Sequence, residues 1–532
     1  MRSDRLLLCV GVSCVLGWAA GARGDDWPQW GGSDERNMVS RARGLSDRFD
    51  PGAKKPDGSG VDPATTKNVK WTARLGSHTY GNPTVLGGKV FLGTNDASLN
   101  DPRGLKSQGG VVLCLEEATG KPLWQLVVPK MKPPQPSFNF DHLNLGVCSS
   151  PTLEGDRVYL VTNRCEVLCL DVNGMANGND GPFKDEGQYM AGPGKPPVTV
   201  AQTDGDIVWR YDMIAELKVW PQDASNCSVL IHGDLVYVCT SNGVDSSHRK
   251  VPSPLAPSLI ALDKKTGRLV ARDQEKIGTR LFHGMWSSPS LGVVNGKAQI
   301  FFGGGDGVCY AFEPAAPGDA GGVLKKVWSY DCNPPGYKIK DGKPVEYING
   351  DIRERRKKGK VEDDGSCVGP SEIIATPVFH GNRVYVATGQ DPLHGKGKGM
   401  LSCIDAAKTG DVTATGKVWS YDQIGRSLST VSISDGLVYV ADLAGLLYCL
   451  DADTGKCCWI HDLKSPAWGS TLVADGKVYI GTEKGDLWVL SAGKEKNVIN
   501  KIHLGAQVYT TPIVANGVLY VASQRFLYAV RG

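Results

Sequence analysis

The feature that most constrains this chain is a short phrase at residues 446–462, LLYCLDADTGKCCWIHD, which recurs with variations along the sequence. Two apolar runs of strand length flank a turn in which Asp451 and Thr454 can bind nearby backbone groups and Gly455 can take a positive φ. The phrase therefore predicts a β-hairpin. Many copies of one hairpin predict a repeat architecture rather than several unrelated domains.

Each copy predicts an inner strand after Ser, Thr or Pro, a strand like VYV, a strand like LYCLD, and an outer strand with tryptophan. The full copies lie at residues 68–128, 142–213, 225–273, 285–332, 372–422, 426–463 and 467–505. The last fragment, from Thr510, supplies three strands, and Val69–Leu75 supplies the fourth. Joining the termini in one blade removes exposed sheet edges. The sequence therefore predicts an all-β, eight-bladed β-propeller of four-stranded antiparallel blades over residues 68–532.

A tryptophan recurs at one position of the repeat, and large aromatic side chains spaced once per blade are expected to pack between neighbouring blades. In the copy at 225–273, Ala271 stands there instead. The predicted docking residues are Trp71, Trp124, Trp209, Trp328, Trp419 and Trp459.

The cysteines are predicted to be structural. Small buried core residues are expected at another repeat position, held by Cys114, Cys169, Cys403 and Cys449. Cys457 and Cys458 adjoin in an outer strand, where neighbouring side chains face opposite ways. The sequence therefore predicts no disulfide framework.

Residues 1–24 have the pattern of a secretory signal peptide, with Arg2 and Arg5, an apolar run over 6–20, and a cleavage site after Ala22 or Gly24. We therefore expect export to the periplasm or the extracellular space. The alternatives to a cleaved signal peptide are a retained membrane anchor and a lipid-attached Cys14. No other run is long and apolar enough to span a bilayer. Residues 25–67 are predicted to be a tail along the body, with Trp27 and Trp30 docked on its surface.

Composition excludes some classes of partner. The chain has 41% hydrophobic residues and a net charge of +3 over 532 residues, which predicts a folded protein without nucleic acid as a partner. A closed ring also favours a monomer. A protein or small-molecule partner in the cell envelope is expected.

The run CLDADTGKCCW at 449–459 resembles the tryptophan-docking motif of quinoprotein dehydrogenases and of propeller repeats similar to those that bind pyrroloquinoline quinone (PQQ). The resemblance covers roughly residues 68–530. The chain is also similar to the propeller lipoprotein of the outer-membrane barrel-assembly machinery, which shares the repeat without a cofactor. Runs such as SSPSLG and GQDPLHG resemble exported bacterial PQQ-like propeller proteins, a likeness that implies no particular reaction.

The four strands of each blade are lettered A to D from the innermost to the outermost. Strand order in such a meander places the connections into strand A and those between strands B and C on one face of the ring, here called the B–C loop face. Polar and aromatic residues gather there, and such a mouth is typical of ligand sites. The insertion 333–371 is a candidate lid, and a second insertion spans 173–206. The ligand-face candidates are Tyr80, Asn95, Asp96, His142, Asn226, Asp245, His248, His283, Trp286, Gln390, Asp391, His394, Trp468 and Tyr509.

Three functions remain open. The leading hypothesis is a non-catalytic binding or scaffold propeller; the alternatives are a PQQ-dependent oxidoreductase acting on an alcohol or sugar, and a scaffold for outer-membrane protein assembly. The resemblance to quinoproteins implies PQQ with calcium over the axis, but no calcium ligand or catalytic Asp aligns residue by residue.

No metal site is predicted. Zinc-like or EF-hand spacing does not occur in the sequence, and Asp171–Asp185, although rich in Asp and Asn, lacks the Gly and Glu of a calcium loop. A solvated loop on the opposite face is predicted for that stretch.

Overall fold

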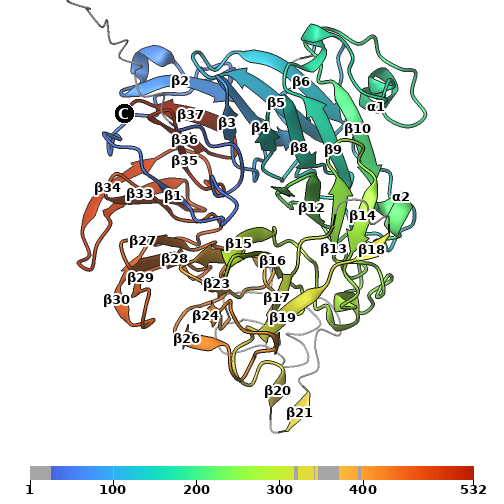
Figure 1. The fold of residues 1–532 in the computed structure, drawn as a ribbon. Coiled ribbons are helices and arrows are strands. Elements are labelled where there is room, and N and C mark those ends of the chain that lie inside the picture. The colour runs from blue at the N-terminus through green and yellow to red at the C-terminus, as the bar shows by residue number, and fades with distance from the viewer. Residues whose placement is uncertain (1–24, 100, 317–320, 341, 345–370, 393–396) are drawn as a thin grey trace, which may run out of the picture.

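The computed structural model describes residues 25–99, 101–316, 321–340, 342–344, 371–392 and 397–532. Eight antiparallel meanders surround an axis, with inner strands such as β3, β15, β27 and β35 nearest the centre (Figure 1). The eight-bladed propeller is confirmed.

The first four blades take their strands in chain order from the inside outward. Blade 1 has β3 (Thr84–Leu86), β4 (Lys89–Asn95), β5 (Gly110–Glu116) and β6 (Pro122–Val128); blade 2 has β7 (Thr152–Glu154), β8 (Arg157–Val161), β9 (Glu166–Asp171) and β10 (Ile207–Asp212). Blade 3 has β11 (Leu230–His232), β12 (Leu235–Cys239), β13 (Leu259–Asp263) and β14 (Leu269–Arg272); blade 4 has β15 (Ser290–Val294), β16 (Lys297–Gly303), β17 (Val308–Phe312) and β19 (Lys326–Asp331).

The next three blades follow the same order, and the eighth is completed from the N-terminal side. Blade 5 has β22 (Val378–His380), β23 (Arg383–Ala387), β24 (Leu401–Asp405) and β26 (Lys417–Tyr421); blade 6 has β27 (Ser432–Ser434), β28 (Leu437–Ala441), β29 (Leu446–Asp451) and β30 (Cys457–Asp462). Blade 7 has β31 (Leu472–Ala474), β32 (Lys477–Gly481), β33 (Asp486–Ser491) and β34 (Val498–His503); blade 8 has β35 (Ile513–Ala515), β36 (Val518–Ala522), β37 (Phe526–Val530) and β2 (Val69–Arg74).

The four-strand expectation is exceeded in three sheets, each of which gains a two-residue parallel strand. These are β1 (Val39–Ser40) inside β31, β18 (Gly322–Val323) outside β14, and β25 (Gly410–Asp411) outside β19. Other short elements are the hairpin β20 (Ile339–Lys340) and β21 (Lys343–Pro344), the α-helices α1 (Glu186–Ala191) and α2 (Met213–Leu217), and the 3-10 helices η1 (Pro63–Thr65), η2 (Asp96–Ser98), η3 (Gly174–Asn177) and η4 (Ile277–Arg280).

The ring closes as the sequence predicts. Strand β2 pairs antiparallel with β37, with Trp71 opposite Ala529, and the Leu75 N–H donates to the Arg525 carbonyl at 2.8 Å. The pairing covers the edge of β37 that would otherwise be open.

The predicted tryptophans dock on the next blade, as expected. The indole Nε1–H of Trp419 donates to the carbonyl of Ala452 at 2.9 Å, and that of Trp71 donates to the carbonyl of Glu117 at 2.9 Å. A Cβ on Gly455 would lie 2.6 Å from the Trp419 ring, so the turn glycine is needed for the close approach as well as for its φ of 69°. The same donation from Nε1 to a carbonyl of the next blade is made by Trp124, Trp209, Trp328 and Trp459.

The cysteines lie as the repeat predicts. Each of the four predicted core thiols is buried, and each lies opposite the docking tryptophan of its blade: Cys114, Cys169, Cys403 and Cys449. Cys457 and Cys458 are half-buried free thiols on β30, the outer strand of blade 6.

The insertion 173–206 packs on the blades through its second half. Helix α1 buries Tyr189 and Met190 in the apolar cluster shared with blade 1, and Glu186 is fully buried. Within the stretch 171–185, for which a solvated loop is predicted, residues 176–185 are exposed or half-buried, whereas Asp171, Gly174 and Met175 are buried. The insertion 333–371 lies mostly outside the described residues.

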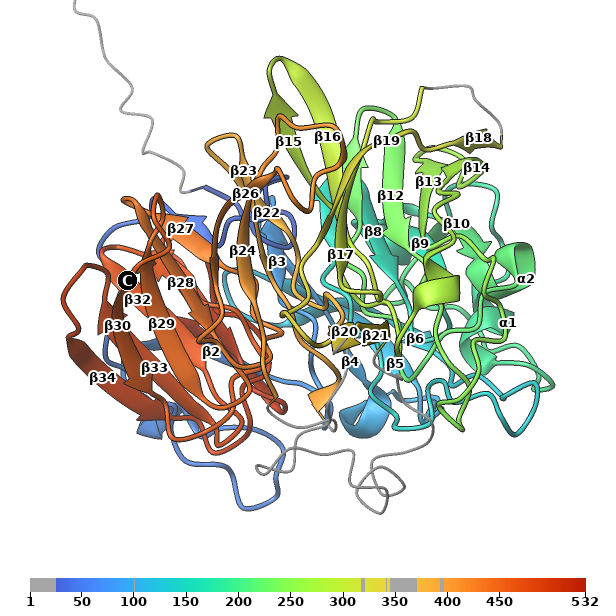
Figure 2. The same cartoon turned by 90° about the horizontal axis from the view of Figure 1, so that it is seen from below.

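Residues 25–40, here called the channel segment, follow the ring in blade order at the end of the A–B turns; Figure 2 shows the ring from the side. The tail therefore lies against the body as predicted, with residues 25–40 across the axis and the later part, for example Leu45 and Lys54, on blade 7. The channel segment accepts a backbone N–H from the inner strand, or the turn after it, of seven blades. In blade order from blade 8, the donors and their acceptors are Asn516 to Asp25 O, Val85 to Trp27 O, Leu153 to Pro28 O, Leu291 to Asp34 O, Phe379 to Glu35 O, Ile433 to Asn37 Oδ1 and Val473 to Met38 O.

Arg36 holds the centre of the channel segment. Its side chain is fully buried, and Nε donates to the Pro289 carbonyl at 3.0 Å and Nη2 to the Val229 carbonyl at 2.9 Å. The latter bond adds blade 3, so the channel segment contacts all eight blades. The axial channel is thereby closed at this end.

Candidate functional site

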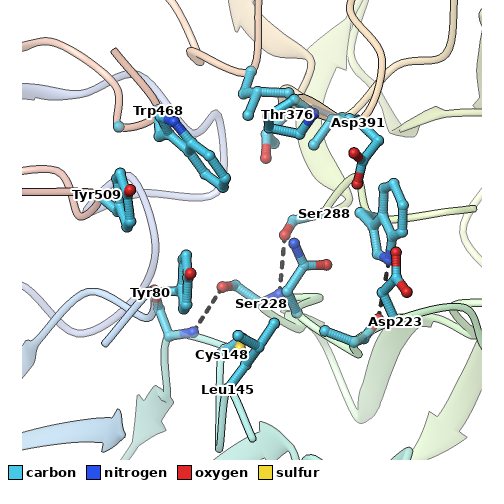
Figure 3. A pocket seen from close by; sticks show the side chains of 18 of the residues that line it. Tyr80, Leu145, Cys148, Asp223, Ser228, Ser288, Thr376, Asp391, Trp468 and Tyr509 are labelled. Atoms are coloured by element: carbon cyan, nitrogen blue, oxygen red, sulfur yellow. Dashed lines mark hydrogen bonds between the residues drawn. The ribbon is translucent and has the colours of Figure 1, made fainter. Parts of the chain in front are cut away.

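A pocket of about 530 Å³ occupies the axis between the channel segment and the B–C loop face. Its volume is typical of small-molecule sites. Figure 3 shows Tyr80, Trp468 and Tyr509 on one side and Asp223 and Asp391 on the other. Trp30 of the channel segment also lines it, and its Nε1–H donates to Thr376 Oγ1 at 3.0 Å.

A belt of Ser, Thr and Asn side chains surrounds the pocket, one from the start of each inner strand. From Thr376 through Asn82 to Ser288, the backbone N–H of one residue donates to the side-chain oxygen of the next at 2.8–3.0 Å. Figure 3 shows the link between Ser228 and Ser288. These groups fix the spacing of the blades and present a polar ring to the cavity. The belt consists of Asn82, Ser150, Ser228, Ser288, Thr376, Thr430, Ser470 and Thr511.

Three aromatic side chains, here called the aromatic wall, come from adjacent connections into strands β31, β35 and β3. The rings of Tyr80 and Tyr509 stack with centroids 5.5 Å apart and planes 11° apart, and the rings of Trp468 and Tyr509 lie 4.4 Å apart. Trp468 Nε1–H donates to Glu483 Oε2 at 3.0 Å, which fixes its ring. The aromatic wall offers a flat apolar surface to a bound ring.

Across the pocket lies a mixed group of Asp223, His283 and Asp391. One donor atom from each lies within 4.8 Å of the others, so the three could hold a metal ion. His283 is buried; its ring stacks on His248 with centroids 4.8 Å apart and meets the edge of Trp286 at 5.2 Å.

Burial shapes the electrostatics of this side. Desolvation, reinforced by the charge of Asp391, raises the pKa of Asp223 to about 7. The pKa of the fully buried Glu372 is raised well above its usual range by burial, although the backbone N–H groups of Gly284 and Asp391 donate to its carboxylate. Burial also lowers the pKa of His142 from its ordinary value, with a smaller contribution from Lys130.

The structure brings most of the predicted ligand-face residues together. Those that line the pocket are Tyr80, His142, Asn226, His248, His283, Trp286, Asp391, Trp468 and Tyr509.

The other predicted residues lie elsewhere. Asn95 caps η2 and binds the Ser77 N–H, Asp96 accepts from Ser107, and Asp245 accepts from Ser247. These three side chains have structural roles in their own loops, as turn-forming Asn and Asp commonly do. Gln390 is fully buried, and His394 lies outside the described residues.

Sequence reasoning missed Asp223, Trp30 and the belt. The belt had a signal, the Ser, Thr or Asn before each inner strand. Asp223 stood close to the predicted Asn226, but nothing in its sequence neighbourhood separated it from a turn former.

Residues 105–350 and 398–496 match the family model described as outer membrane protein assembly factor BamB. The matched ranges make up more than half of the chain. The chain belongs to this family of PQQ-like propellers.

The family likeness to individual proteins is local. The BamB of Escherichia coli (strain K12) is 33% identical over 93 residues, and that of Salmonella typhimurium (strain LT2) is 31% identical over 93 residues. Each match covers 16% of this chain and 24% of the relative. The matched region thus spans about a quarter of the curated relatives.

Two solved structures share the fold. The quinohemoprotein alcohol dehydrogenase of Comamonas testosteroni has a TM-score of 0.57 at 13% identity, covering 96% of this chain and 81% of that one. A europium-containing methanol dehydrogenase has a TM-score of 0.54 at 14% identity, covering 94% and 89%. At this identity the likeness shows the propeller fold alone.

In the part of the chain that the structure describes, no helix is both long and apolar enough to cross a bilayer.

Proposed function

We propose that this BamB-family chain is an exported ligand-binding propeller of the cell envelope, whose small-molecule ligand enters the axial pocket from the B–C loop face. The single observation that carries this proposal is a pocket closed at one end by the channel segment and lined by an aromatic wall facing a group of Asp and His side chains. Such a cavity combines apolar area with a few convergent polar groups, as small-molecule sites do.

Binding rather than turnover is favoured by how the hydroxyl groups are used. Ser150 Oγ accepts the Asn82 N–H and Ser228 Oγ accepts the Ser150 N–H, each within 3.0 Å. By accepting backbone N–H groups, these hydroxyls hold neighbouring blades together. Their arrangement suits a rigid binding site.

The described lining does not fit PQQ. The aromatic wall would stack on a planar quinone, but PQQ carries three carboxylates, and the lining residues include Asp223 and Asp391 and, among those described, neither Lys nor Arg. Like charges in a partly desolvated pocket repel. The oxidoreductase alternative is therefore disfavoured.

The second candidate function is a role in outer membrane protein assembly, which the family model favours. Export supports either role and rests on the sequence of residues 1–24, which lie outside the described part. Asp25, which directly follows the proposed cleavage position, is bound to the body, since its carbonyl accepts the Asn516 N–H. N-terminal sequencing of the protein recovered from the envelope fraction tests this: a start between residues 23 and 25 supports export with cleavage, and a start at Met1 opposes it.

The ligand proposal is tested by calorimetric titration of residues 25–532 with a panel of monosaccharides, nucleosides, aromatic acids and PQQ. At least one non-quinone compound is expected to bind saturably, and Trp468→Ala should weaken that binding at least tenfold, about 1.4 kcal/mol. Trp488→Ala, a half-buried tryptophan on β33 away from the pocket lining, is the control and should bind as the parent does. Binding that survives Trp468→Ala, or no binding across the panel, would overturn the proposal.

A further inference from the structure

We propose that Asp223, His283 and Asp391 bind one divalent transition-metal ion, of the Zn²⁺ or Mn²⁺ class, in the axial pocket. These residues come from three separate connections: Asp223 precedes β11, His283 precedes β15, and Asp391 follows β23. Their donor atoms nevertheless lie within 4.8 Å of one another. The ring geometry alone brings them together.

The spacing is close to that of a loaded site. Donors at roughly 2.0–2.2 Å from one ion are separated by about 3–3.5 Å. Closing the trio from 4.8 Å around an ion thus needs movements of about 1 Å, which side-chain rotation in loop residues supplies. No rearrangement of the blades is required.

The donor types select the metal. One imidazole and two carboxylates suit Zn²⁺, Mn²⁺ or Fe²⁺, whereas Ca²⁺ and Mg²⁺ prefer oxygen donors only. The two carboxylates also contribute negative charge, which attracts a divalent cation in a partly desolvated pocket.

Neighbouring groups hold the donors in place, as outer-sphere partners do in metal sites. Asn139 Nδ2 and Gln222 Nε2 both donate to Asp223 Oδ1, at 2.8 and 3.1 Å. The Asp391 N–H donates to Glu372 Oε1 at 3.1 Å. The His283 ring is confined between those of His248 and Trp286.

Three protein ligands leave coordination positions open toward the cavity. The ligand class follows from this site together with the proposed function, on which it rests: a compound with vicinal hydroxyls that bind the metal at one end and a flat ring that packs on the aromatic wall. The ion would fix the orientation of that compound, and the aromatic wall would supply contact area.

The test is metal stoichiometry on protein stripped with chelator, dialysed against ZnCl₂, MnCl₂ or CaCl₂ and analysed by mass spectrometry. One equivalent of Zn²⁺ or Mn²⁺ is expected, and His283→Ala and Asp391→Asn should each weaken binding at least 100-fold. His380→Ala, an exposed histidine at the end of β22, is the matched control. Because His283→Ala alters a buried site, its melting curve is recorded, and Asp391→Asn, a half-buried and nearly isosteric change, serves if the first variant misfolds.

A second readout is the visible spectrum of Co²⁺-loaded protein, whose d–d bands should disappear in His283→Ala and persist in His380→Ala. Trp468→Ala separates the two proposals, since it should weaken organic-ligand binding at least tenfold and leave the metal equivalent unchanged. If the protein binds the organic ligand but no metal, the metal-site inference is wrong and the proposed binding function stands. No bound metal, selective uptake of Ca²⁺, or Zn²⁺ binding that His283→Ala does not weaken would overturn it.

Discussion

Arg36 is the residue on which closure of the channel depends, and Arg36→Met tests this. Burial lowers the pKa of Arg36 to about 10, so the guanidinium is still charged at neutral pH. Besides the carbonyls of Pro289 and Val229, it donates to the Trp30 carbonyl at 2.7 Å and to Gln29 Oε1 at 2.9 Å. Methionine replaces only the apolar stem of the arginine and can make none of these bonds.

The magnitude follows from the groups left behind. Three buried carbonyls without a donor cost about 1–3 kcal/mol each, and removal of a buried charge returns several kcal/mol of desolvation. We expect a net loss of about 2–4 kcal/mol in the free energy of unfolding, a large share of the ~5–15 kcal/mol typical of a domain. The channel segment should also detach before the blades unfold, because its contacts lie at one end of the ring and Arg36 joins it to the centre.

The assay combines guanidinium denaturation with amide hydrogen exchange over residues 25–40. The variant should unfold at lower denaturant, and the amides of the channel segment should exchange faster while those of β37 exchange as before. Arg41→Met, an exposed arginine next to the channel segment, is the control and should match the parent. If Arg36→Met has the parent's midpoint and the parent's exchange, Arg36 does not hold the channel closed.

Three further predictions follow from the fold. Deleting Val69–Leu75 should open blade 8 and sharply lower the melting temperature, since β37 loses its partner strand; a truncated protein that melts like the parent would contradict the closure. Trp419→Ala should cost about 3–5 kcal/mol in a denaturant titration and Trp419→Phe less, because phenylalanine keeps the ring contact with Gly455 and loses only the bond to Ala452; equal losses would refute this docking geometry. Burial raises the pKa of Asp141 to about 6, so the folded state binds this proton more tightly than the unfolded state, and the contribution of Asp141 to stability falls as pH rises from about 4 to 6; Asp141→Asn should flatten that part of the pH profile of unfolding, and an unchanged slope would contradict it.

The ring could be predicted from the sequence alone. The blade count, the closing strand and the tryptophan docking all follow from a repeat whose signals are local: a turn with Gly455, an alternation of apolar residues, and an indole a fixed number of residues later. Local signals of this kind can be recognised without knowledge of the fold, because every copy packs against an equivalent neighbouring blade and so keeps the same pattern. The sequence also indicated the ligand face, since strand order alone decides which loops share a side.

The chemistry of the pocket could be recognised only in the folded structure. Asp223, His283 and Asp391 are separated by 60 and 108 residues, and no spacing rule joins them, because the distance between loops across the axis depends on the closed ring. The same holds for the channel segment, whose run of polar residues gave no sign that Arg36 would be buried where the inner strands converge. The repeat fixes where each blade stands, and the residues that differ between copies meet only after the ring has closed.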